Sequence, residues 1–114
     1  MNNIFHRPWG TYQILVEDDN CKVKKIIVQP GQKLSLQSHE KRNELWQIID
    51  GDGEVTLNSD IKPVFAGSTI HIPKKTIHRV ENTGNKPLIF IEVQTGEYFG
   101  EDDIKRYEDI YGRI

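Results

Sequence analysis

The stretch that decides the fold is PGQKLSLQSHEKRNELWQIIDGDG, residues 30–53. It contains two runs of strand-type composition, Lys33–His39 and Glu44–Asp50, joined by a polar turn and bounded by Pro-Gly and Gly-Asp-Gly. Side chains alternate between the two faces of a strand, so Gln37 and His39 project from the same face of the first run. The stretch therefore predicts two neighbouring strands, the first of which carries an amide and an imidazole side by side.

Outward from this stretch, the chain repeats one pattern, in which short runs rich in Ile, Val, Leu and Thr alternate with turn residues. Strands this short and evenly spaced favour a sandwich or a barrel over a parallel sheet, which needs helices between its strands. We therefore expect a single all-β domain over residues 1–114, long enough to bury one modest core. The predicted strands are the two above together with Tyr12–Val16, Lys22–Val28, Glu54–Asn58, Ile61–Phe65, Thr69–Ile72, Ile77–Asn82 and Leu88–Thr95.

Only the C-terminus has helical periodicity. Ile104, Tyr107 and Tyr111 recur at the spacing of one helix face, and Asp102 or Asp103 could cap the start of that helix. Carboxylates are favourable at this position because the helix dipole attracts negative charge. We expect a short C-terminal helix that covers an edge or an end of the barrel, or that closes one side of an active site.

The composition limits the range of partners. A net charge of −2 gives no basic field for nucleic acid or an anionic membrane, and no apolar segment is long enough to span a bilayer. The N-terminus lacks the apolar run of a signal peptide, and the single cysteine, Cys21, can form no disulfide within the chain. These features predict a protein of the reducing cytoplasm that binds neither nucleic acid nor a membrane.

A candidate metal site combines Gln37 and His39 with two further residues. Glu44 opens the next strand, and His78 follows the Ile72-Pro73 turn on a later strand. Two imidazoles, a carboxylate and an amide oxygen suit one divalent metal ion, with zinc as the first choice and Mn²⁺, Fe²⁺, Co²⁺ or Ni²⁺ as alternatives. One open coordination position would serve catalysis better than structure. The alternative role for Gln37 is to orient a metal-bound water.

Two groups of residues in this region have a characteristic spacing. They are Gly31, Gln37, His39, Glu44 and Gly51 in the first group, and Gly67, Pro73, His78 and Asn82 in the second. This spacing resembles the two motifs of the cupin superfamily, which implies a double-stranded β-helix, or jelly-roll, barrel. Gln37 stands where most metal cupins have a histidine, and Lys75 stands where the second motif usually has glycine. The first departure is informative, because phosphomannose isomerases are similar to this chain in using a Gln, His, Glu, His metal set.

Further stretches cover nearly the whole chain: Arg7-Pro8-Trp9-Gly10-x-Tyr12, Leu34-Ser35-Leu36-Gln37, Arg42-x-Glu44-x-Trp46, Ile91-Glu92-Val93-Gln94-x-Gly96-x-Tyr98, Gly100-Glu101-Asp102-Asp103-Ile104 and Asp109-x-Tyr111-Gly112-Arg113. They resemble the type II mannose-6-phosphate isomerase domain, which often forms the C-terminus of bifunctional enzymes that also carry a mannose-1-phosphate guanylyltransferase domain. The chain has no glycine-rich nucleotide loop. The resemblance implies a free-standing, metal-dependent isomerase that interconverts mannose 6-phosphate and fructose 6-phosphate, within GDP-mannose biosynthesis.

Two residues are candidates for catalysis. Arg42 precedes Glu44 by two residues, so strand alternation could place its guanidinium on the metal's side, and phosphomannose isomerases of the other type resemble this in placing a lysine there. Glu92 is the first choice for the base that moves the proton, with a metal-bound water or another His or Glu left open. The candidates for substrate binding are Arg7, Trp9, Lys24, Arg79, Gln94 and Tyr98, with Lys33 and Arg106 as weaker phosphate ligands.

Two other classes of function are compatible with the sequence. One is another sugar-directed cupin isomerase or epimerase, such as a nucleotide-sugar enzyme that needs no metal. The other is a non-catalytic module that binds a sugar phosphate. In each case the partner is a small-molecule sugar phosphate or a related sugar, and we expect a homodimer because cupin barrels often pair through strand edges.

Overall fold

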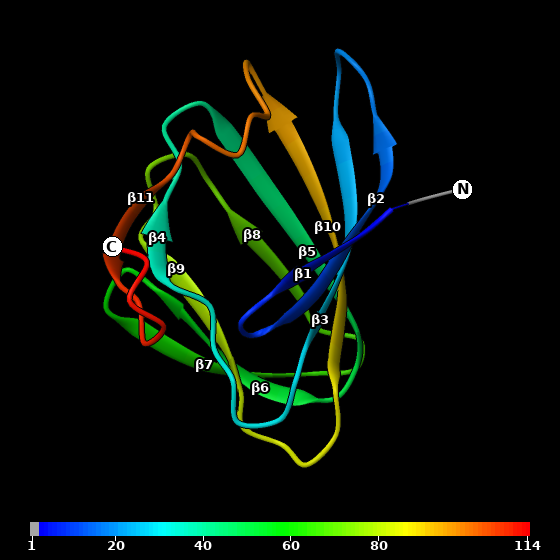
Figure 1. Cartoon of the computed structure of the whole chain (residues 1–114), viewed down its shortest axis with the longest axis vertical. Helices are drawn as coiled ribbons and strands as arrows, with labels where there is room; N and C mark the ends of the chain where they lie inside the picture. The colour runs from blue at the N-terminus through cyan, green and yellow to red at the C-terminus, as the bar shows by residue number, and fades with distance from the viewer. Residues whose placement is uncertain (1–2) are drawn as a thin grey trace.

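The computed structural model describes residues 3–114, so the first two residues of the predicted domain lie outside the described part. The described residues form two antiparallel sheets that enclose a common interior (Figure 1). The first sheet has the order β1-β2-β3-β10-β5-β8, and the second has the order β11-β4-β9-β6-β7. The strands are β1 (Ile4–Arg7), β2 (Gly10–Glu17), β3 (Lys22–Val28), β4 (Leu36–Ser38), β5 (Arg42–Asp50), β6 (Asp52–Leu57), β7 (Asp60–Phe65), β8 (Thr69–Ile72), β9 (His78–Asn82), β10 (Leu88–Gly96) and β11 (Lys105–Glu108).

The predicted fold class is confirmed, because the described chain is all-β and its two sheets form a jelly-roll barrel. Each predicted strand is present, with ends that shift by a few residues. The largest change is at Lys33–His39, which is reduced to β4 because Lys33 makes only an isolated bridge to Glu81. The sequence did not predict β1, which pairs with β2 as a hairpin around the Pro8-Trp9 turn.

The predicted C-terminal helix is wrong. Residues 105–108 form β11, which pairs antiparallel with β4, and no helix that could span a membrane occurs in residues 3–114. The Tyr107 hydroxyl bonds to the Ser38 hydroxyl and the Tyr111 hydroxyl donates to Gln32. A short isolated helix is marginal in water, so pairing with the open edge of β4 outweighs the weak helical pattern.

The inward-facing side chains change from polar to apolar along the strands of the first sheet. Strand β10 lies between β3 and β5, and its register aligns residues of like character into layers that cross all three strands. From the polar end, these layers are Lys22, Gln94 and Glu44; Lys24, Glu92 and Trp46; Ile26, Phe90 and Ile48; and Val28 and Leu88. The barrel is therefore closed by an apolar core at one end and has a buried polar interior at the other.

The apolar end supplies the hydrophobic stabilisation. Phe90 is fully buried and its ring lies 4.6 Å from that of Trp46, which is 1% exposed. Gly51 connects β5 to β6 with φ +95°, and a Cβ there would lie 2.7 Å from the Pro87 carbonyl oxygen. Only glycine fits this close approach without strain, so the hairpin that closes the apolar end depends on it.

Replacement of Phe90 tests the location of the core. We expect Phe90→Ala to lower the free energy of unfolding by about 3–5 kcal/mol, because it removes a buried aromatic side chain and leaves a cavity. The matched control is Phe65→Ala on β7, where the side chain is 55% exposed and the expected loss is below about 1 kcal/mol. Urea denaturation of both variants measures the difference, and equal losses would contradict this assignment of the core.

Candidate metal centre and substrate cavity

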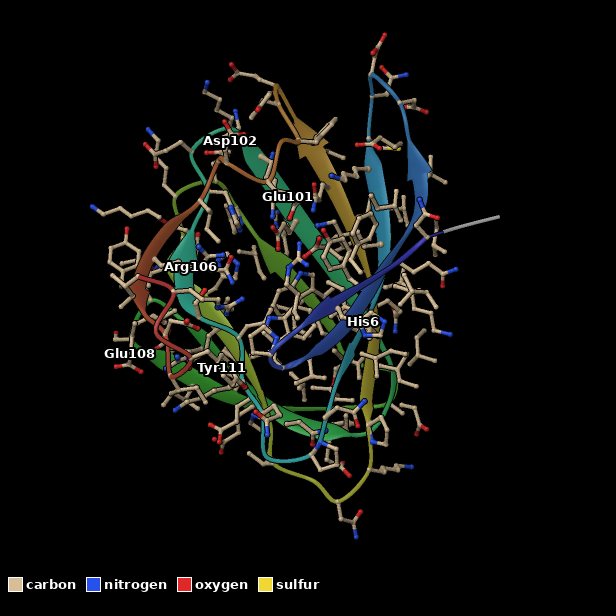
Figure 2. The ribbon with its side chains drawn as sticks, in the orientation of Figure 1. His6, Glu101, Asp102, Arg106, Glu108 and Tyr111 are labelled. Atoms are coloured by element: carbon tan, nitrogen blue, oxygen red, sulfur yellow. The ribbon has the colours of Figure 1, made fainter. Side chains whose placement is uncertain are left out.

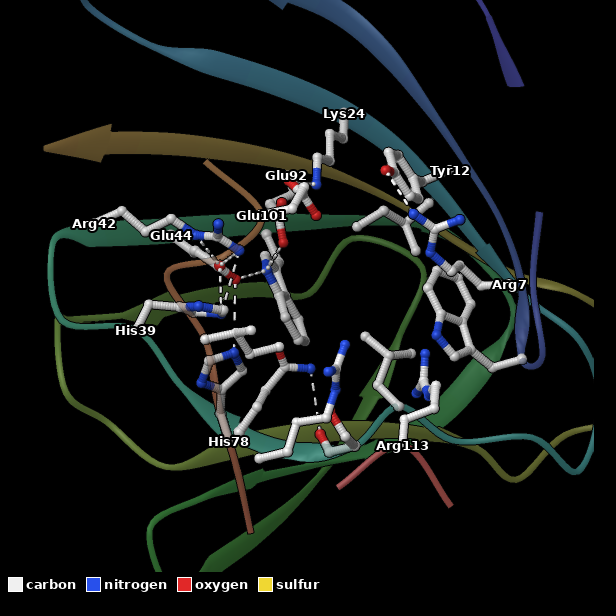
Figure 3. A pocket seen from close by; sticks show the side chains of 18 residues that line it. Arg7, Tyr12, Lys24, His39, Arg42, Glu44, His78, Glu92, Glu101 and Arg113 are labelled. Carbon is white, nitrogen blue, oxygen red and sulfur yellow. Dashed lines mark hydrogen bonds and ion pairs between the residues drawn. The ribbon is translucent and has the colours of Figure 1, made fainter. Parts of the chain in front are cut away.

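The polar end of the barrel contains a cavity whose walls come from both sheets and from the C-terminal segment (Figure 3). In Figure 3, His39, Arg42, Glu44 and His78 gather at one side of the cavity, whereas Arg7, Tyr12 and Arg113 lie at the other side. The lining residues that the sequence predicted for the site are Arg7, Trp9, Lys24, Gln37, His39, Arg42, Glu44, His78 and Glu92. The cavity is thus divided into one side rich in metal-ligating groups and one rich in guanidinium groups.

Glu44 is the centre of the metal-ligating side and is almost fully buried. Its Oε2 accepts from Arg42 Nε at 2.8 Å and lies 3.2 Å from His39 Nε2. Its Oε1 accepts from Trp46 Nε1 at 3.0 Å and lies 3.7 Å from His78 Nε2. Burial acts to raise the pKa of Glu44, but the positive charge of His78, when that ring is protonated, and the charge of Arg42 outweigh it, so the pKa lies below its ordinary value. This carboxylate therefore stays ionised in the interior.

The two histidines are held in the tautomer that suits a metal ligand. His39 Nδ1 donates to the Asp103 carbonyl oxygen at 2.6 Å, and His78 Nδ1 donates to the Thr76 carbonyl oxygen at 2.9 Å. A carbonyl oxygen can only accept, so each Nδ1 carries a proton, and in the neutral ring Nε2 is the atom with the lone pair. Burial, followed by the charge of Arg42, lowers the pKa of His39 to about 4, which keeps this imidazole neutral at pH 7.

These residues fit a divalent cation. One ligand atom each from His39, Glu44 and His78 lies within 4.8 Å of the others, and the donors are two imidazoles and a carboxylate. Gln37 lines the same cavity from β4 and is paired in register with His78. Its amide nitrogen donates to the Ser35 carbonyl oxygen at 3.3 Å, which leaves the amide oxygen as the free end of the group. The chemistry of the set is that of a mixed N/O metal site.

Arg42 lies beside the metal-ligating groups, as strand alternation predicts. Its guanidinium Nη2 lies 2.8 Å from Glu44 Oε2 and donates to His39 Nε2 at 3.2 Å. The charge of Glu44 outweighs the effect of burial and raises the pKa of Arg42 above its ordinary value. Arg42 is therefore a fixed positive charge that contacts two of the candidate ligands.

Glu92 is a second buried carboxylate one layer below Glu44. Trp46 Nε1 donates to both carboxylates, at 3.1 Å to Glu92 Oε2, and Gln94 Nε2 donates to Glu92 Oε1 at 2.6 Å. Burial raises the pKa of Glu92 to about 7, with a further contribution from the negative charge of Glu44. A carboxyl group with a pKa near neutrality can both accept and return a proton.

The opposite side of the cavity can attract an anion. Arg7 donates to the Tyr12 hydroxyl at 3.2 Å, and Lys24 Nζ lies 4.3 Å from the centre of the Tyr12 ring. Arg106 and Arg113 also line the cavity, and the Nε of Arg106 is buried without a hydrogen-bond partner. Trp9, which the sequence predicted to lie beside the sugar, is buried and also lines the cavity.

Three of the predicted substrate-binding residues, and Lys33 among the weaker phosphate candidates, do not line the cavity. Arg79 points toward the second sheet's edge, where it donates to the Leu34 carbonyl oxygen and to Glu108. Tyr98 is 41% exposed and donates to Asp102. Gln94 is fully buried one layer nearer the polar end than Glu92, and its amide nitrogen donates to that carboxylate. We leave Arg79 and Tyr98 out of the proposal below.

Sequence reasoning missed most of the contribution of the C-terminal segment, residues 98–114. Figure 2 shows Asp102, Arg106, Glu108 and Tyr111 following one another along the barrel edge beside β4. Glu101 Oε2 accepts from Lys24 at 2.8 Å and from Lys22 at 3.2 Å, instead of beginning a helix. The pairing of Asp109 with Arg113 is the one signal that the sequence offered, as a carboxylate and a guanidinium four residues apart.

Lys75 adopts the left-handed conformation, with φ +68°, at the position where the cupin motif usually has glycine. Its backbone N–H donates to the His39 carbonyl oxygen at 2.7 Å. The turn before His78 is thereby joined to the strand end that carries His39. This backbone hydrogen bond connects the two motifs. The left-handed conformation at Lys75 is strained because its side chain has a Cβ atom.

Solved structures with the same architecture identify the class of fold. A Klebsiella pneumoniae protein described as having a double-stranded β-helix domain superposes with a TM-score of 0.75 and 22% identity, covering 85% of this chain and 83% of its own. The capsular polysaccharide assembling protein CapF of Staphylococcus aureus superposes with a TM-score of 0.80 and 19% identity, covering 96% of this chain and 35% of its own. The protein is a cupin-fold barrel.

Sequence similarity identifies the family to which this cupin-fold protein belongs. The family described as "Mannose-6-phosphate isomerase C-terminal" matches residues 1–109, and the chain belongs to this family. It is 44% identical over 108 residues to the alginate biosynthesis protein AlgA of Pseudomonas putida, covering 95% of this chain and 22% of the relative. It is 41% identical over 114 residues to the mannose-1-phosphate guanylyltransferase ManC of Salmonella typhimurium, covering 100% of this chain and 24% of the relative. The chain thus spans about a quarter of the length of these relatives.

The strain at Lys75 predicts a stabilising substitution. We expect Lys75→Gly to raise the free energy of unfolding by about 0.5–1 kcal/mol, because relief of the left-handed penalty exceeds the entropy that glycine adds to the unfolded chain. The control is Lys74→Gly, where φ is not positive and the expected change is a loss of similar size. Thermal denaturation measures both variants, and a loss in Lys75→Gly would contradict the strain.

The ion pairs of Glu101 predict a pH dependence of stability. Burial acts to raise the pKa of Glu101, but Lys24 and Lys22 outweigh it and lower the pKa to about 2. Because the folded pKa is depressed, the stabilisation is complete above the unfolded pKa of about 4.3 and is lost as the pH falls toward the folded value. The stability difference between the wild type and Glu101→Gln should therefore shrink from pH 6 to pH 3. Denaturation curves over this pH range test this expectation. The control is Glu97→Gln, which removes the exposed ion pair between Glu97 and Lys74.

Proposed function

We propose that this protein is a metal-dependent aldose–ketose isomerase that interconverts mannose 6-phosphate and fructose 6-phosphate. The observation that carries the proposal is one cavity in which a candidate metal centre, a carboxyl group with a pKa near 7 and a guanidinium-rich wall lie together. Membership of the Mannose-6-phosphate isomerase C-terminal family supports the choice of reaction. We also keep two predictions made from the sequence, that the protein forms a homodimer and that it is located in the cytoplasm.

The metal centre would comprise His39, Glu44 and His78, with the amide oxygen of Gln37 as the fourth protein ligand. A divalent cation held there would act as a Lewis acid toward the carbonyl group of the open-chain sugar. Zinc remains the first choice for this mixed N/O set. Arg42, which contacts Glu44 and His39, would add a second positive charge beside the reacting carbons.

Glu92 is the group that we assign to proton transfer. Its carboxylate would take the proton from C2 of the aldose, giving the enediol, and its carboxyl group would return that proton to C1, while the hydroxyl proton passes between the two oxygens. No proton or electron is gained or lost overall, as an isomerisation requires. Gln94 and Trp46 donate to separate oxygens of Glu92, so they fix the direction in which it faces the substrate.

The phosphate group would bind at the other side of the cavity. Arg7, Arg106 and Arg113 line it there, and Lys24 lies between this wall and Glu92. One guanidinium group can bind two phosphate oxygens at once. Binding of the phosphate at this wall would hold the reacting carbons at the metal-ligating side of the cavity. Trp9 and Tyr12 would form the wall along the carbon chain of the sugar.

A metal-supplemented coupled assay against a panel of sugar phosphates tests the proposal. We expect turnover of mannose 6-phosphate that a chelator abolishes, loss of bound metal in Glu44→Gln, and a 10²–10⁴-fold loss of kcat in Glu92→Gln with its metal retained. Glu54→Gln, exposed on β6, is the control and should keep full activity.

Other results would support the alternative functions. Saturable binding of mannose 6-phosphate without turnover, in protein that has metal, would indicate a non-catalytic sugar-phosphate binding module. Turnover of a different sugar that resists chelation would indicate another cupin isomerase or epimerase. Full activity of Glu92→Gln would exclude Glu92 as the group that moves the proton.

A further inference from the structure

The two candidate histidine ligands are oriented in different ways. His78 donates through Nδ1 to the carbonyl of Thr76, two residues away on the same turn. His39 donates through Nδ1 to the carbonyl of Asp103, which is 64 residues away in the C-terminal segment. The ring of His78 is therefore fixed by its own loop. The ring of His39 accepts a longer bond at Nε2 from Arg42, at 3.2 Å, but its shorter bond is the one to a distant part of the chain.

Asp103 contacts the strand end that carries His39 with three acceptor atoms. Its carbonyl accepts from the ring, while Oδ1 accepts from the backbone N–H of Glu40 and Oδ2 from that of Lys41, each at 3.0 Å. The carboxylate thus binds the two residues that directly follow His39. These two bonds hold the backbone of Asp103 against the strand end, and they place its carbonyl where the imidazole can donate to it.

The neighbouring Asp102 makes no comparable contact. Its Oδ1 accepts from the Tyr98 hydroxyl within the same segment. The two aspartates have the same charge and adjacent positions, so a long-range electrostatic effect on the metal centre would be similar for both. The difference between them is that Asp103 forms direct hydrogen bonds with residues 39–41.

We propose that Asp103 is a positioning residue for the metal centre: its carboxylate binds the backbone of Glu40 and Lys41 and thereby holds its carbonyl on His39 Nδ1, which keeps the Nε2 lone pair of His39 directed at the metal. The proposal rests on the function proposed above for the metal centre itself. Partners of this kind set the tautomer and ring orientation of metal-bound histidines, and their loss typically weakens metal binding 10–100-fold. In Asp103→Ala the carbonyl group remains, but the two carboxylate hydrogen bonds that hold it in place are lost. We therefore expect a loss of metal affinity near the lower limit of this range.

The first experiment measures zinc affinity by competition with a chromophoric chelator in the full chain. We expect Asp103→Ala to bind zinc about tenfold more weakly than the wild type. Asp103→Asn should lose less, because its Oδ1 can still accept one of the two N–H groups. Asp102→Ala is the control with the same change in charge, and its affinity should equal that of the wild type.

The second experiment reads the tautomer of His39 directly, by ¹⁵N NMR of the imidazole rings in protein prepared without metal. The wild type should show both His39 and His78 protonated at Nδ1. In Asp103→Ala, only the longer bond from Arg42 still favours the Nδ1-protonated form of His39, so the share of the Nε2-protonated tautomer should rise above that of the wild type. His78 should stay protonated at Nδ1 and serves as an internal control for an intact fold. If Asp103→Ala is unfolded, the same comparison is made with Asp103→Asn.

The two experiments separate this inference from the proposed function. If the wild type binds neither zinc nor any of the four alternative cations, the metal centre is wrong, but the tautomer of His39 still shows whether Asp103 positions it. If Asp103→Ala binds zinc as tightly as Asp102→Ala and its His39 keeps a single tautomer, the positioning role is overturned. A loss of affinity equal in both aspartate variants would overturn it too, because charge alone would then explain the result.

Discussion

The burial of the Glu44 carboxylate is the constraint on which the rest of the site depends. An ionised carboxylate inside a protein is very costly unless charges and hydrogen-bond donors surround it. Here Arg42 and Trp46 donate to it, and the Nε2 atoms of His39 and His78 lie within 4 Å of its oxygens. Those four partners come from β5, β9 and the end of β4. The two sheets must therefore close before the carboxylate is fully compensated.

The register of β10 explains how such a site coexists with a small hydrophobic core. Because β10 pairs with both β3 and β5, its inward residues set the character of whole layers. Glu92 and Gln94 belong to the polar layers and Phe90 and Leu88 to the apolar ones, on a single strand. The polar layers lie at the end of the barrel that the C-terminal segment partly covers, where Glu101 compensates the buried ammonium groups of Lys22 and Lys24. The residues that form the hydrophobic core and the residues of the candidate site therefore lie at opposite ends of the same strands.

Local patterns predicted most of this arrangement. Alternation along the strands placed His39, Glu44 and Trp46 on the correct faces, and motif spacing brought His78 to them. The same reasoning failed at residues 102–111, because the local spacing of Ile104, Tyr107 and Tyr111 resembles a helix face, whereas the deciding partner is the edge of β4 more than sixty residues earlier. Asp103 was assigned to a helix cap for the same reason. Nothing within a few residues of it indicates that its carbonyl would meet His39.

The attachment of the C-terminal segment has a consequence for the order of folding. Apart from the bond between Arg79 and Glu108, the side-chain bonds that join it to the barrel connect residues 62 to 79 positions apart, such as those from Lys41 to Asp103 and from Lys22 to Glu101. Loops of this length close late, after the local hairpins have formed. Chain ends with many exposed residues, as in this segment, are also the parts that open first in native-state fluctuations. A nascent or partly folded chain would already contain the candidate ligands but would leave the ring of His39 free to rotate. Competence to bind a cation would then be the last property that the chain acquires as it folds, and the first that it loses as it frays.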